Sequence, residues 1–488
     1  MTKEIRDSAT PLAQMTSAGK QDQRQPNPLV QLNMPAQQIG TDRQAEVIQL
    51  SKAFIENQVL PVLDREPRLR TSPQDYTHAV KFPGKHQVDG ESAINLAKET
   101  LSKRREVSLY VHIPTCSYKC TFCHYPVVVS NHQEEIDGWV DTIIKESELY
   151  QRRIPEIRDC RVTSFYVGGG TPTLLDQRAL ERLITHFREN YNFDKDLEIT
   201  IEGTPDSCTH EKINFLSDLG VNRVSVGVQT LNNSLLGSVN RQHDADRALE
   251  CIDALVASRI RTVNCDLIYG FADQSAQSFL SDLDRVLSYG PTSVTVYRVR
   301  LGRSDEGPSA MLRLFEKDPT KFPSIEIVYT MQHAARNLAG LYGYHEEPSG
   351  WFSQPGSRVQ VYKDRWIDQK PMIGFGWQAY SYSKGWEYHN FKERGRYLTN
   401  LNSGKLPLEF GYAYDEDERQ RRLIAFRLKS QFQLSEDEFR ARFGQGSVWA
   451  SAVGSLRAIG LLEKNSPNLN SVGKVLVEEF VEKFLIKK

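Results

Sequence analysis

The sequence predicts an α/β fold, a partial (β/α)6 barrel of six parallel strands, each followed by a helix. Six short runs rich in apolar and β-branched residues recur along the chain, at residues 107–113, 162–168, 197–203, 223–228, 262–270 and 292–299. Helix-like stretches lie between them, at residues 134–151, 177–190, 210–220, 245–258 and 276–288. Because strands that alternate with helices pair in parallel through right-handed crossovers, this order predicts one parallel sheet.

The strand composition also predicts where the reacting groups lie. Near-continuous apolar strands fit a sheet that is buried on both faces. Six strand–helix units make a partial barrel rather than the closed eight-fold one, and in such barrels the reacting groups sit at the C-terminal ends of the strands. Candidate site residues are therefore expected where each strand ends.

The segments that flank the barrel differ in composition. Residues 1–45 are polar and rich in Gln and Pro, which predicts a disordered arm. Residues 46–106 are expected to form a helical N-terminal extension, followed by the barrel over residues 107–345. Residues 346–410 are rich in Trp, Tyr and Gly and are expected to form a connecting region of loops and short strands. Residues 411–488 contain four helical stretches, which predict a small helical domain of winged-helix type that acts as a structural lid.

Composition excludes several classes of function. The chain has 61 Lys and Arg residues against 62 Asp and Glu residues, so no basic excess points to nucleic acid or to a membrane surface. No run of about 18 apolar residues predicts a membrane span, and the N-terminal residues do not resemble a secretory signal. Three of the seven cysteines crowd together, which favours a reducing compartment, the cytoplasm, and a metal-type cluster of ligands.

The crowded cysteines are Cys116, Cys120 and Cys123, a CxxxCxxC array directly after the first strand. Three thiolates on one short loop can bind three irons of a [4Fe–4S] cluster, whose irons are held by cysteine sulfur. The fourth iron then lacks a protein ligand and is open to a substrate or cofactor. Structural zinc would need a second pair of ligands, and no CxxC or HxxxH pair follows in the sequence. The array therefore favours an open cluster over zinc or unrelated buried thiols.

This array resembles the signature of the radical S-adenosylmethionine (SAM) superfamily. The longer string YVHIPTCSYKCTFC resembles one branch, the oxygen-independent coproporphyrinogen III oxidases and their relatives. The resemblance continues through GGGTPTLL (168–175), IEGTPDS (201–207), DLIYGFADQS (266–275) and IGFGWQAYSY (373–382), and covers about residues 107 to 390. It implies that the cluster passes one electron to SAM, and that SAM splits to methionine and a 5′-deoxyadenosyl radical that abstracts hydrogen from carbon. Several relatives bind a second SAM beside the first.

The resemblance assigns SAM-binding roles to residues at the strand ends. Gly168, Gly169 and Gly170, with Thr171, match the site for the methionyl amine of SAM. Glycine there also allows a ligand to approach the backbone closely. Glu202 ends the third strand, where its carboxylate can pair with the SAM ammonium; a helix-capping role is the alternative.

Further candidates follow the later strands. Gln229 and Asp266 end the fourth and fifth strands and match positions that contact SAM, where they could hydrogen-bond the ribose hydroxyls. Arg241 could bind the SAM carboxylate through two parallel hydrogen bonds; an exposed salt bridge is the alternative reading.

Aromatic residues beside the cysteines are also candidates. Tyr110 and His112 are two apart on the first strand, so their side chains share one face. The match to YxHIP favours catalytic roles beside the cluster, with Tyr110 also contacting the cofactor. Phe122, between two cysteines, is expected to shield or stack near SAM; plain packing is the alternative.

Two departures from the relatives bear on the reaction. Coproporphyrinogen oxidases carry a further cysteine two positions after the last ligand, where this chain has Tyr125. The haem-chaperone relatives carry an HNxxYW motif, where residues 361–366 read VYKDRW. These departures favour carbon methylation or cyclopropanation of a small aromatic or heterocyclic substrate, with a second SAM as methyl donor. Oxidative decarboxylation of coproporphyrinogen III and a haem-binding chaperone are the alternatives.

The reaction also implies partners. A radical SAM enzyme needs a one-electron donor, such as a flavodoxin or a ferredoxin, and a small-molecule substrate.

Overall fold

The computed structural model describes residues 37–71, 84–304, 307–346, 348–357, 369–431, 435–444 and 447–486. Most of the predicted disordered arm and the VYKDRW segment lie outside these residues. The end of the arm, from Thr41, is already helical. At the centre is a sheet of 13 strands in the order β1-β17-β16-β15-β14-β2-β5-β6-β7-β8-β9-β13-β12.

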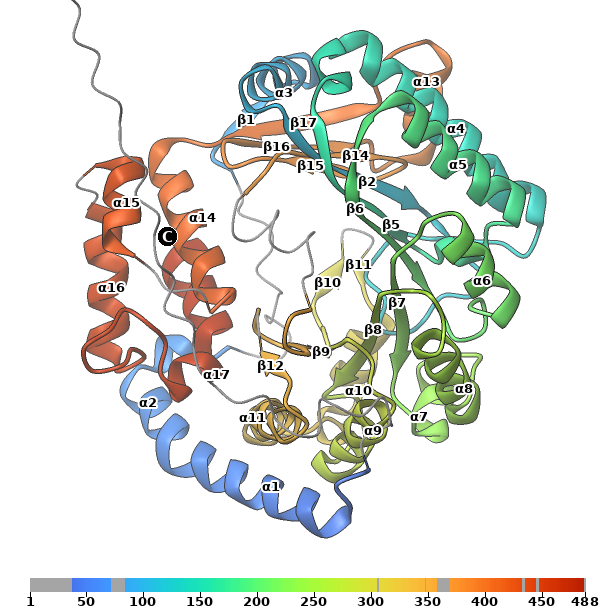
Figure 1. Ribbon diagram of the computed structural model, residues 1–488. Helices are drawn as coiled ribbons and strands as arrows, with labels where there is room; N and C mark the ends of the chain where they lie inside the picture. Colours follow the sequence, from blue (N-terminus) through green and yellow to red (C-terminus); the bar gives the residue numbers. More distant parts are fainter. Residues whose placement is uncertain are drawn as a thin grey trace, which may run out of the picture. The chain divides into compact units, whose positions relative to one another are not determined.

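The six predicted strands form the parallel centre of this sheet and follow one another in chain order, so the predicted partial barrel is confirmed. They are β2 (Glu106–Ile113), β5 (Arg161–Gly169), β6 (Asn192–Gly203), β7 (Arg223–Gln229), β8 (Thr262–Tyr269) and β9 (Ser293–Arg298). Figure 1 shows them as a curved sheet whose outer face carries the crossover helices.

All but the first of the crossover helices begin at capping residues that the sequence supplies. Asp176 accepts a hydrogen bond from the Ala179 amide at 2.7 Å, and Thr209, Asp244 and Ser275 cap later helices in the same way. Such caps satisfy amides that have no partner inside the helix. The helices are α4 (Gln133–Arg153), α5 (Gln177–Asn190), α6 (His210–Asp218), α7 (Asn233–Ser238), α8 (Ala245–Val256) and α9 (Ala276–Ser288).

The two faces of the parallel strands differ in chemistry. On β2, Val107, Leu109 and Val111 belong to the main apolar core. The intervening Tyr110 and His112 belong to the opposite, inner face. The expectation of strands that are apolar on both faces therefore fails for the inner face, which is lined by polar side chains.

The sheet continues beyond the barrel on the side of β2. β14 (Met372–Phe375) pairs in parallel with β2, placing Gly374 beside Tyr110. Antiparallel strands then extend the edge: β15 (Tyr380–Tyr382), β16 (Trp386–Asn390), β17 (Leu408–Ala413) and β1 (His86–Val88). Helices α3 (Gly90–Arg104) and α13 (Arg394–Asn402) belong to this region. The short strands expected after residue 345 thus join the main sheet.

The opposite edge is closed by β13 (Trp351–Ser353) and β12 (His345–Glu346), which follow α11 (Ile325–Leu341). Short elements lie between β9 and α11: β10 (Arg303–Ser304), β11 (Gly307–Pro308) and α10 (Ala310–Lys317).

A second apolar core joins the two ends of the described chain. The four predicted C-terminal helices are α14 (Glu416–Lys429), α15 (Glu436–Phe443), α16 (Ser447–Ile459) and α17 (Ser471–Phe480). The N-terminal helices are α1 (Thr41–Phe54), η2 (Ile55–Val59) and α2 (Leu60–Arg65). Ile55 and Val59 are fully buried in this core together with Leu456 and Leu476. The N-terminal extension is therefore an integral support for the C-terminal helices (Figure 1).

Within the described ranges, no helix combines the length and the apolar character that crossing a membrane requires.

Candidate active site

The cysteine loop begins where β2 ends, and its first and last residues pair with each other as two short strands. β3 (Thr115–Cys116) pairs with β4 (Val128–Val129), and the Ser130 amide donates to the Cys116 carbonyl at 3.0 Å. Within the loop, the Cys123 amide donates to the Cys120 carbonyl at 3.2 Å. These backbone bonds hold the half-buried thiols of Cys116, Cys120 and Cys123 on one compact loop.

Two of the three thiols contact residues from other strand ends. The Thr171 hydroxyl donates to Cys116 Sγ at 3.5 Å, and Arg241 Nη1 donates to Cys120 Sγ at 3.6 Å. Burial, with the neighbouring sulfurs, raises the pKa of Cys116 and raises that of Cys123 to about 11. The free thiols of Cys116 and Cys123 therefore keep their protons at neutral pH, and metal binding must displace these protons.

The glycine run at the end of β5 is needed because other groups occupy the space of a side chain. A Cβ atom on Gly168 would stand 2.8 Å from Glu202 Oε2, and one on Gly169 2.8 Å from the His112 ring. Gly169 also has a φ of +113°, which side chains rarely allow. A Cβ atom on Gly170 would meet the Thr115 carbonyl. The run therefore lets the cysteine loop and the barrel side chains pack against the backbone of β5.

Glu202 lies beside the same glycines. Its carboxylate accepts hydrogen bonds from the Tyr166 hydroxyl at 2.5 Å and from the Gly169 amide at 2.9 Å. Burial raises its pKa, against the opposing effect of these two bonds and of the Arg223 charge. Glu202 is thus not a helix cap; it is a carboxylate inside the barrel that lies against the glycine run.

Asp266 belongs to a hydrogen-bonded network across the inner faces of β7 and β8. Ser225 Oγ and Asn264 Nδ2 donate to its carboxylate at 3.1 and 2.9 Å. Burial, with the nearby charge of Glu202, raises the pKa of Asp266 to about 7. The inner face therefore holds two carboxylates, and the buried cation Arg223 lowers the pKa of both.

Gln229, the last residue of β7, and Arg241, which follows α7, both lie beside Gly227. Gln229 adopts a φ of +69°, and a Cβ atom on Gly227 would stand 2.6 Å from its Nε2. Arg241 Nη2 donates to the Gly227 carbonyl, and its guanidinium lies 5.8 Å from the centre of the Tyr118 ring. Its buried Nε has no hydrogen-bond partner in the described part of the chain. Arg241 is therefore a buried cation beside the cysteine loop, not an exposed salt bridge.

Tyr110 and His112 share one face, as their spacing predicts. The Tyr110 hydroxyl and His112 Nδ1 are 2.8 Å apart. Burial lowers the pKa of His112 to about 4, so the imidazole is neutral. Its buried Nε2 has no hydrogen-bond partner among the described residues and is open to a ligand. Phe122 packs against Phe271, with ring centres 5.7 Å apart, at the border of a small apolar cluster.

Sequence patterns alone do not mark several inner-face residues, among them Tyr166, Arg223, Ser225 and Asn264. Their only signal is a polar residue at every second position of a strand, and the apolar residues between them hide it.

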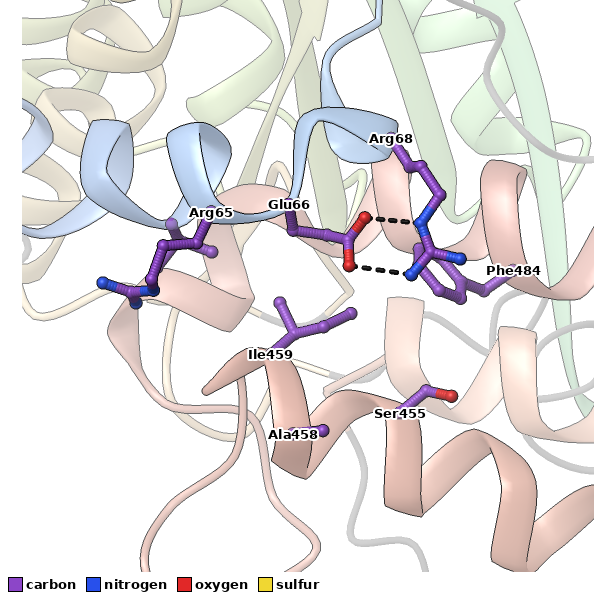
Figure 2. A pocket seen from close by; sticks show the side chains of 8 residues that line it. Arg65, Glu66, Arg68, Ser455, Ala458, Ile459 and Phe484 are labelled. Atoms are coloured by element: carbon purple, nitrogen blue, oxygen red, sulfur yellow. Dashed lines mark hydrogen bonds and ion pairs between the residues drawn. The ribbon is translucent and has the colours of Figure 1, made fainter.

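One cavity lies elsewhere (Figure 2). It measures about 270 Å³ and lies among η3 (Pro67–Leu69), α16 and η8 (Val481–Ile486). Arg68 binds Glu66 through two bonds of 2.5 and 2.8 Å and covers the Phe484 ring. None of the predicted site residues lines this cavity. It belongs to the packing of the N-terminal extension on the C-terminal helices.

Comparison with known proteins identifies the barrel. The profile described as the Radical SAM superfamily matches residues 110–286, which include the cysteine loop and the C-terminal ends of β2, β5, β6, β7 and β8. The chain has a radical SAM domain. Radical SAM enzymes use a [4Fe–4S] cluster and SAM, and the residues present fit both groups.

The fit rests on the donor set. Three thiols lie on one loop, and no three His, Cys, Asp or Glu side chains of the described ranges are grouped around a single ion. A cubane cluster differs from a single ion because each thiolate binds its own iron. Among the described residues, His112 Nε2 and Arg241 Nε are buried and have no hydrogen-bond partner, so both are available for polar contacts with SAM.

The similar proteins of known function include coproporphyrinogen III oxidases and a heme chaperone. An oxygen-independent coproporphyrinogen III oxidase of Salmonella typhimurium is 34% identical over 46% of this chain and 47% of its own length. One of Pseudomonas aeruginosa is 26% identical over 76% of this chain and 81% of its own length. The heme chaperone HemW of Lactococcus lactis is 26% identical over 78% of this chain and 97% of its own length.

A solved structure shares the fold. The coproporphyrinogen III oxidase (HemN) of Escherichia coli superposes with a TM-score of 0.73 at 24% identity, covering 84% of this chain and 97% of that chain. None of the relatives described here is a methyltransferase. The sequence-based preference for carbon methylation is therefore unconfirmed, and the alternative of a coproporphyrinogen oxidase fits the comparisons better.

Proposed function

We propose that this radical SAM enzyme catalyses the oxygen-independent oxidative decarboxylation of coproporphyrinogen III or a closely related tetrapyrrole. The observation that carries the proposal is the shared placement of the Cys116, Cys120 and Cys123 thiols with Thr171 and Arg241 at the C-terminal strand ends. The similarity to coproporphyrinogen oxidases over about three quarters of the chain supports the substrate.

Each group of residues has a role in this proposal. The three cysteines hold three irons of the cluster, and the fourth iron is left for SAM. Arg241 places a positive charge beside Cys120 and the bound cofactor, since its guanidinium already contacts that sulfur. When bound, the cluster and SAM supply a 5′-deoxyadenosyl radical that abstracts hydrogen from a substrate carbon.

The remaining inner-face residues bind and orient. Glu202 and the backbone of Gly168–Gly170 hold the amino-acid end of SAM, and Gln229 and Asp266 hold its ribose. His112 is neutral through the physiological range because burial lowers its pKa to about 4. It therefore offers a hydrogen bond rather than a charge, through the Nε2 atom that Tyr110 leaves free.

A second candidate function, haem binding, is supported by one specific observation. The heme chaperone of Lactococcus lactis is matched over 97% of its length, so haem binding is the competing function. A flavodoxin or ferredoxin as electron donor, and a second SAM, belong to the proposal as expectations.

The test is an anaerobic assay of the reconstituted protein with coproporphyrinogen III, a one-electron reductant and SAM labelled in its methyl group. The proposal predicts an unlabelled product that has lost CO₂, formed together with 5′-deoxyadenosine. A labelled product would mean methyl transfer. Stoichiometric haem binding without 5′-deoxyadenosine would favour the chaperone. Either result would contradict the proposal.

A further inference from the structure

Tyr125 combines an inner position with an open surface. It follows Cys123 by two residues, and the Cys123 thiol lies 3.8 Å from its carbonyl. Its side chain is 64% exposed. A large aromatic ring beside the cluster loop that keeps this much open surface is available to a ligand.

The neighbours of Tyr125 show that this surface faces the barrel opening. Its phenol is within electrostatic range of Glu202 on β6, Arg300 just after β9 and Tyr380 on β15. These residues come from strands on both sides of β2 and β5 in the sheet order. Glu202 belongs to the inner face of the sheet, so a phenol within electrostatic range of its carboxylate is placed on the inner side and not on the helix-covered face. Its open surface therefore faces the space above the strand ends.

A direct hydrogen bond fixes Arg300 next to this loop. His124 Nε2 and the Arg300 carbonyl are 2.9 Å apart, so residues 124 and 300 are held side by side. The Arg300 side chain is half-buried, and its buried Nε has no hydrogen-bond partner in the ranges that the structure describes. Within those ranges, no ion pair of this guanidinium accompanies the buried Nε, although a half-buried cation is usually paired with an anion.

Tyr380 supplies the aromatic side of the same space. Its ring centre lies 6.4 Å from that of Tyr110 and 5.7 Å from that of Tyr382. Tyr110 contacts His112 and thus the candidate radical site. The aromatic surface therefore continues from the site to the region that Tyr125 faces.

We propose that Tyr125, Arg300 and Tyr380 form the substrate-binding wall above the cluster, where Arg300 binds a carboxylate and the two tyrosine rings contact the ring that carries it. The ligand class is a carboxylate-bearing conjugated or heterocyclic ring. This inference rests on the proposed function and deepens it, because it assigns substrate recognition to residues outside the SAM site. A guanidinium can bind a carboxylate through two parallel hydrogen bonds, and a tyrosine ring offers a rigid apolar face.

The experiment compares wild-type holoenzyme with Arg300→Gln, Arg300→Lys, Tyr125→Phe and Tyr125→Ala. Arg259→Gln is the matched control, because Arg259 is exposed, pairs with Asp218 and lies just before β8, at the opposite ends of the strands. Two quantities are measured: the KM for coproporphyrinogen III, and the binding of coproporphyrin III and of its tetramethyl ester by fluorescence. The 5′-deoxyadenosine formed without substrate reports whether the cluster and SAM site are intact.

The wall predicts that Arg300→Gln raises the KM at least about 10-fold and removes the preference for the free acid over the ester. Arg300→Lys restores part of the wild-type affinity and part of the preference for the free acid. Tyr125→Phe keeps the KM within about 3-fold of the wild-type value, whereas Tyr125→Ala raises the KM about 10-fold. Substrate-free 5′-deoxyadenosine formation is unchanged in all variants.

Two results would overturn the proposal in distinguishable ways. If wild type converts coproporphyrinogen III while Arg300→Gln keeps the wild-type KM and the acid preference, the wall is refuted and the proposed function stands. If wild type forms 5′-deoxyadenosine but neither binds nor converts the tetrapyrrole, the proposed function fails, and the wall fails with it.

Discussion

Arg241 donates a hydrogen bond to the Cys120 thiol across 3.6 Å and so links the chain after β7 to the cysteine loop after β2. The two residues are 121 positions apart: Cys120 lies in the loop after β2, and Arg241 lies between α7 and α8. The contact places a permanent positive charge at a sulfur that is expected to bind iron.

Replacing Arg241 tests this charge. We expect Arg241→Gln to lower 5′-deoxyadenosine formation about 10- to 100-fold, because a hydrogen bond to a charged group contributes about 1.5–3 kcal/mol. Arg241→Lys should recover only part of the 5′-deoxyadenosine formation. The guanidinium contacts Cys120 and the Gly227 carbonyl through two different nitrogens, and an ammonium has only one. The assay is paired with EPR spectra of the reduced cluster with and without SAM. Unchanged spectra and unchanged turnover in Arg241→Gln would refute the role.

The strained glycine next to His112 gives a prediction on folding. Gly169→Ala should destabilise the protein by about 2–4 kcal/mol, because the added Cβ combines a φ of +113° with a 2.8 Å approach to the imidazole. It should also lower the iron content. Gly138→Ala is the control: Gly138 lies within α4 and a Cβ there meets nothing within 4 Å, so a gain of up to about 1 kcal/mol is expected. Urea unfolding of both variants measures the difference, and equal stabilities would contradict the geometry.

A buried carboxyl outside the reaction predicts a pH dependence of stability. Glu146 on α4 accepts bonds from the Gly376 amide, Asn390 Nδ2 and the Tyr397 hydroxyl, each at 2.7 Å. Burial raises its pKa to about 7. The folded state therefore holds this proton more tightly than the unfolded chain does. The stabilisation is complete below about pH 4.5 and is lost as the pH rises through 7.

This contribution is about 3 kcal/mol across the window. Glu146→Gln has no proton to lose, so the free energy of unfolding of the variant should fall less than that of wild type between pH 5 and pH 8. Chemical denaturation at both pH values measures it. Parallel pH profiles for the two proteins would show that Glu146 titrates normally.

The sequence predicts local elements well because their signals are local. Helix α5 follows its amphipathic pattern and its Asp176 cap, and β5 follows its run of apolar residues. The pairing of β14 with β2 has no such signal: Met372 lies beside Ser108, and nothing near either residue specifies a partner that far along the chain. The expected connecting region therefore did not predict an extension of the main sheet.

In the candidate site too, contiguous motifs are predicted from the sequence, and contacts between distant segments are not. The spacing of Cys116, Cys120 and Cys123 and the glycine run are contiguous motifs, which the sequence displays directly. The contact of Tyr166 with Glu202 and the proximity of Tyr125 to Arg300 depend on how separate strands meet. Such contacts become visible only when the strands are placed in space.

Formation of 5′-deoxyadenosine from SAM tests the central claim most directly. The protein is reconstituted anaerobically with iron and sulfide and reduced, and the product is quantified for wild type and for Cys116→Ala, Cys120→Ala and Cys123→Ala. Cys160→Ala is the control, since Cys160 is a buried thiol at the start of β5, the end of the strand opposite the cysteine loop. We predict product from wild type and the control and none above background from the other three. Product from any of these three, or none from cluster-loaded wild type, would contradict the account.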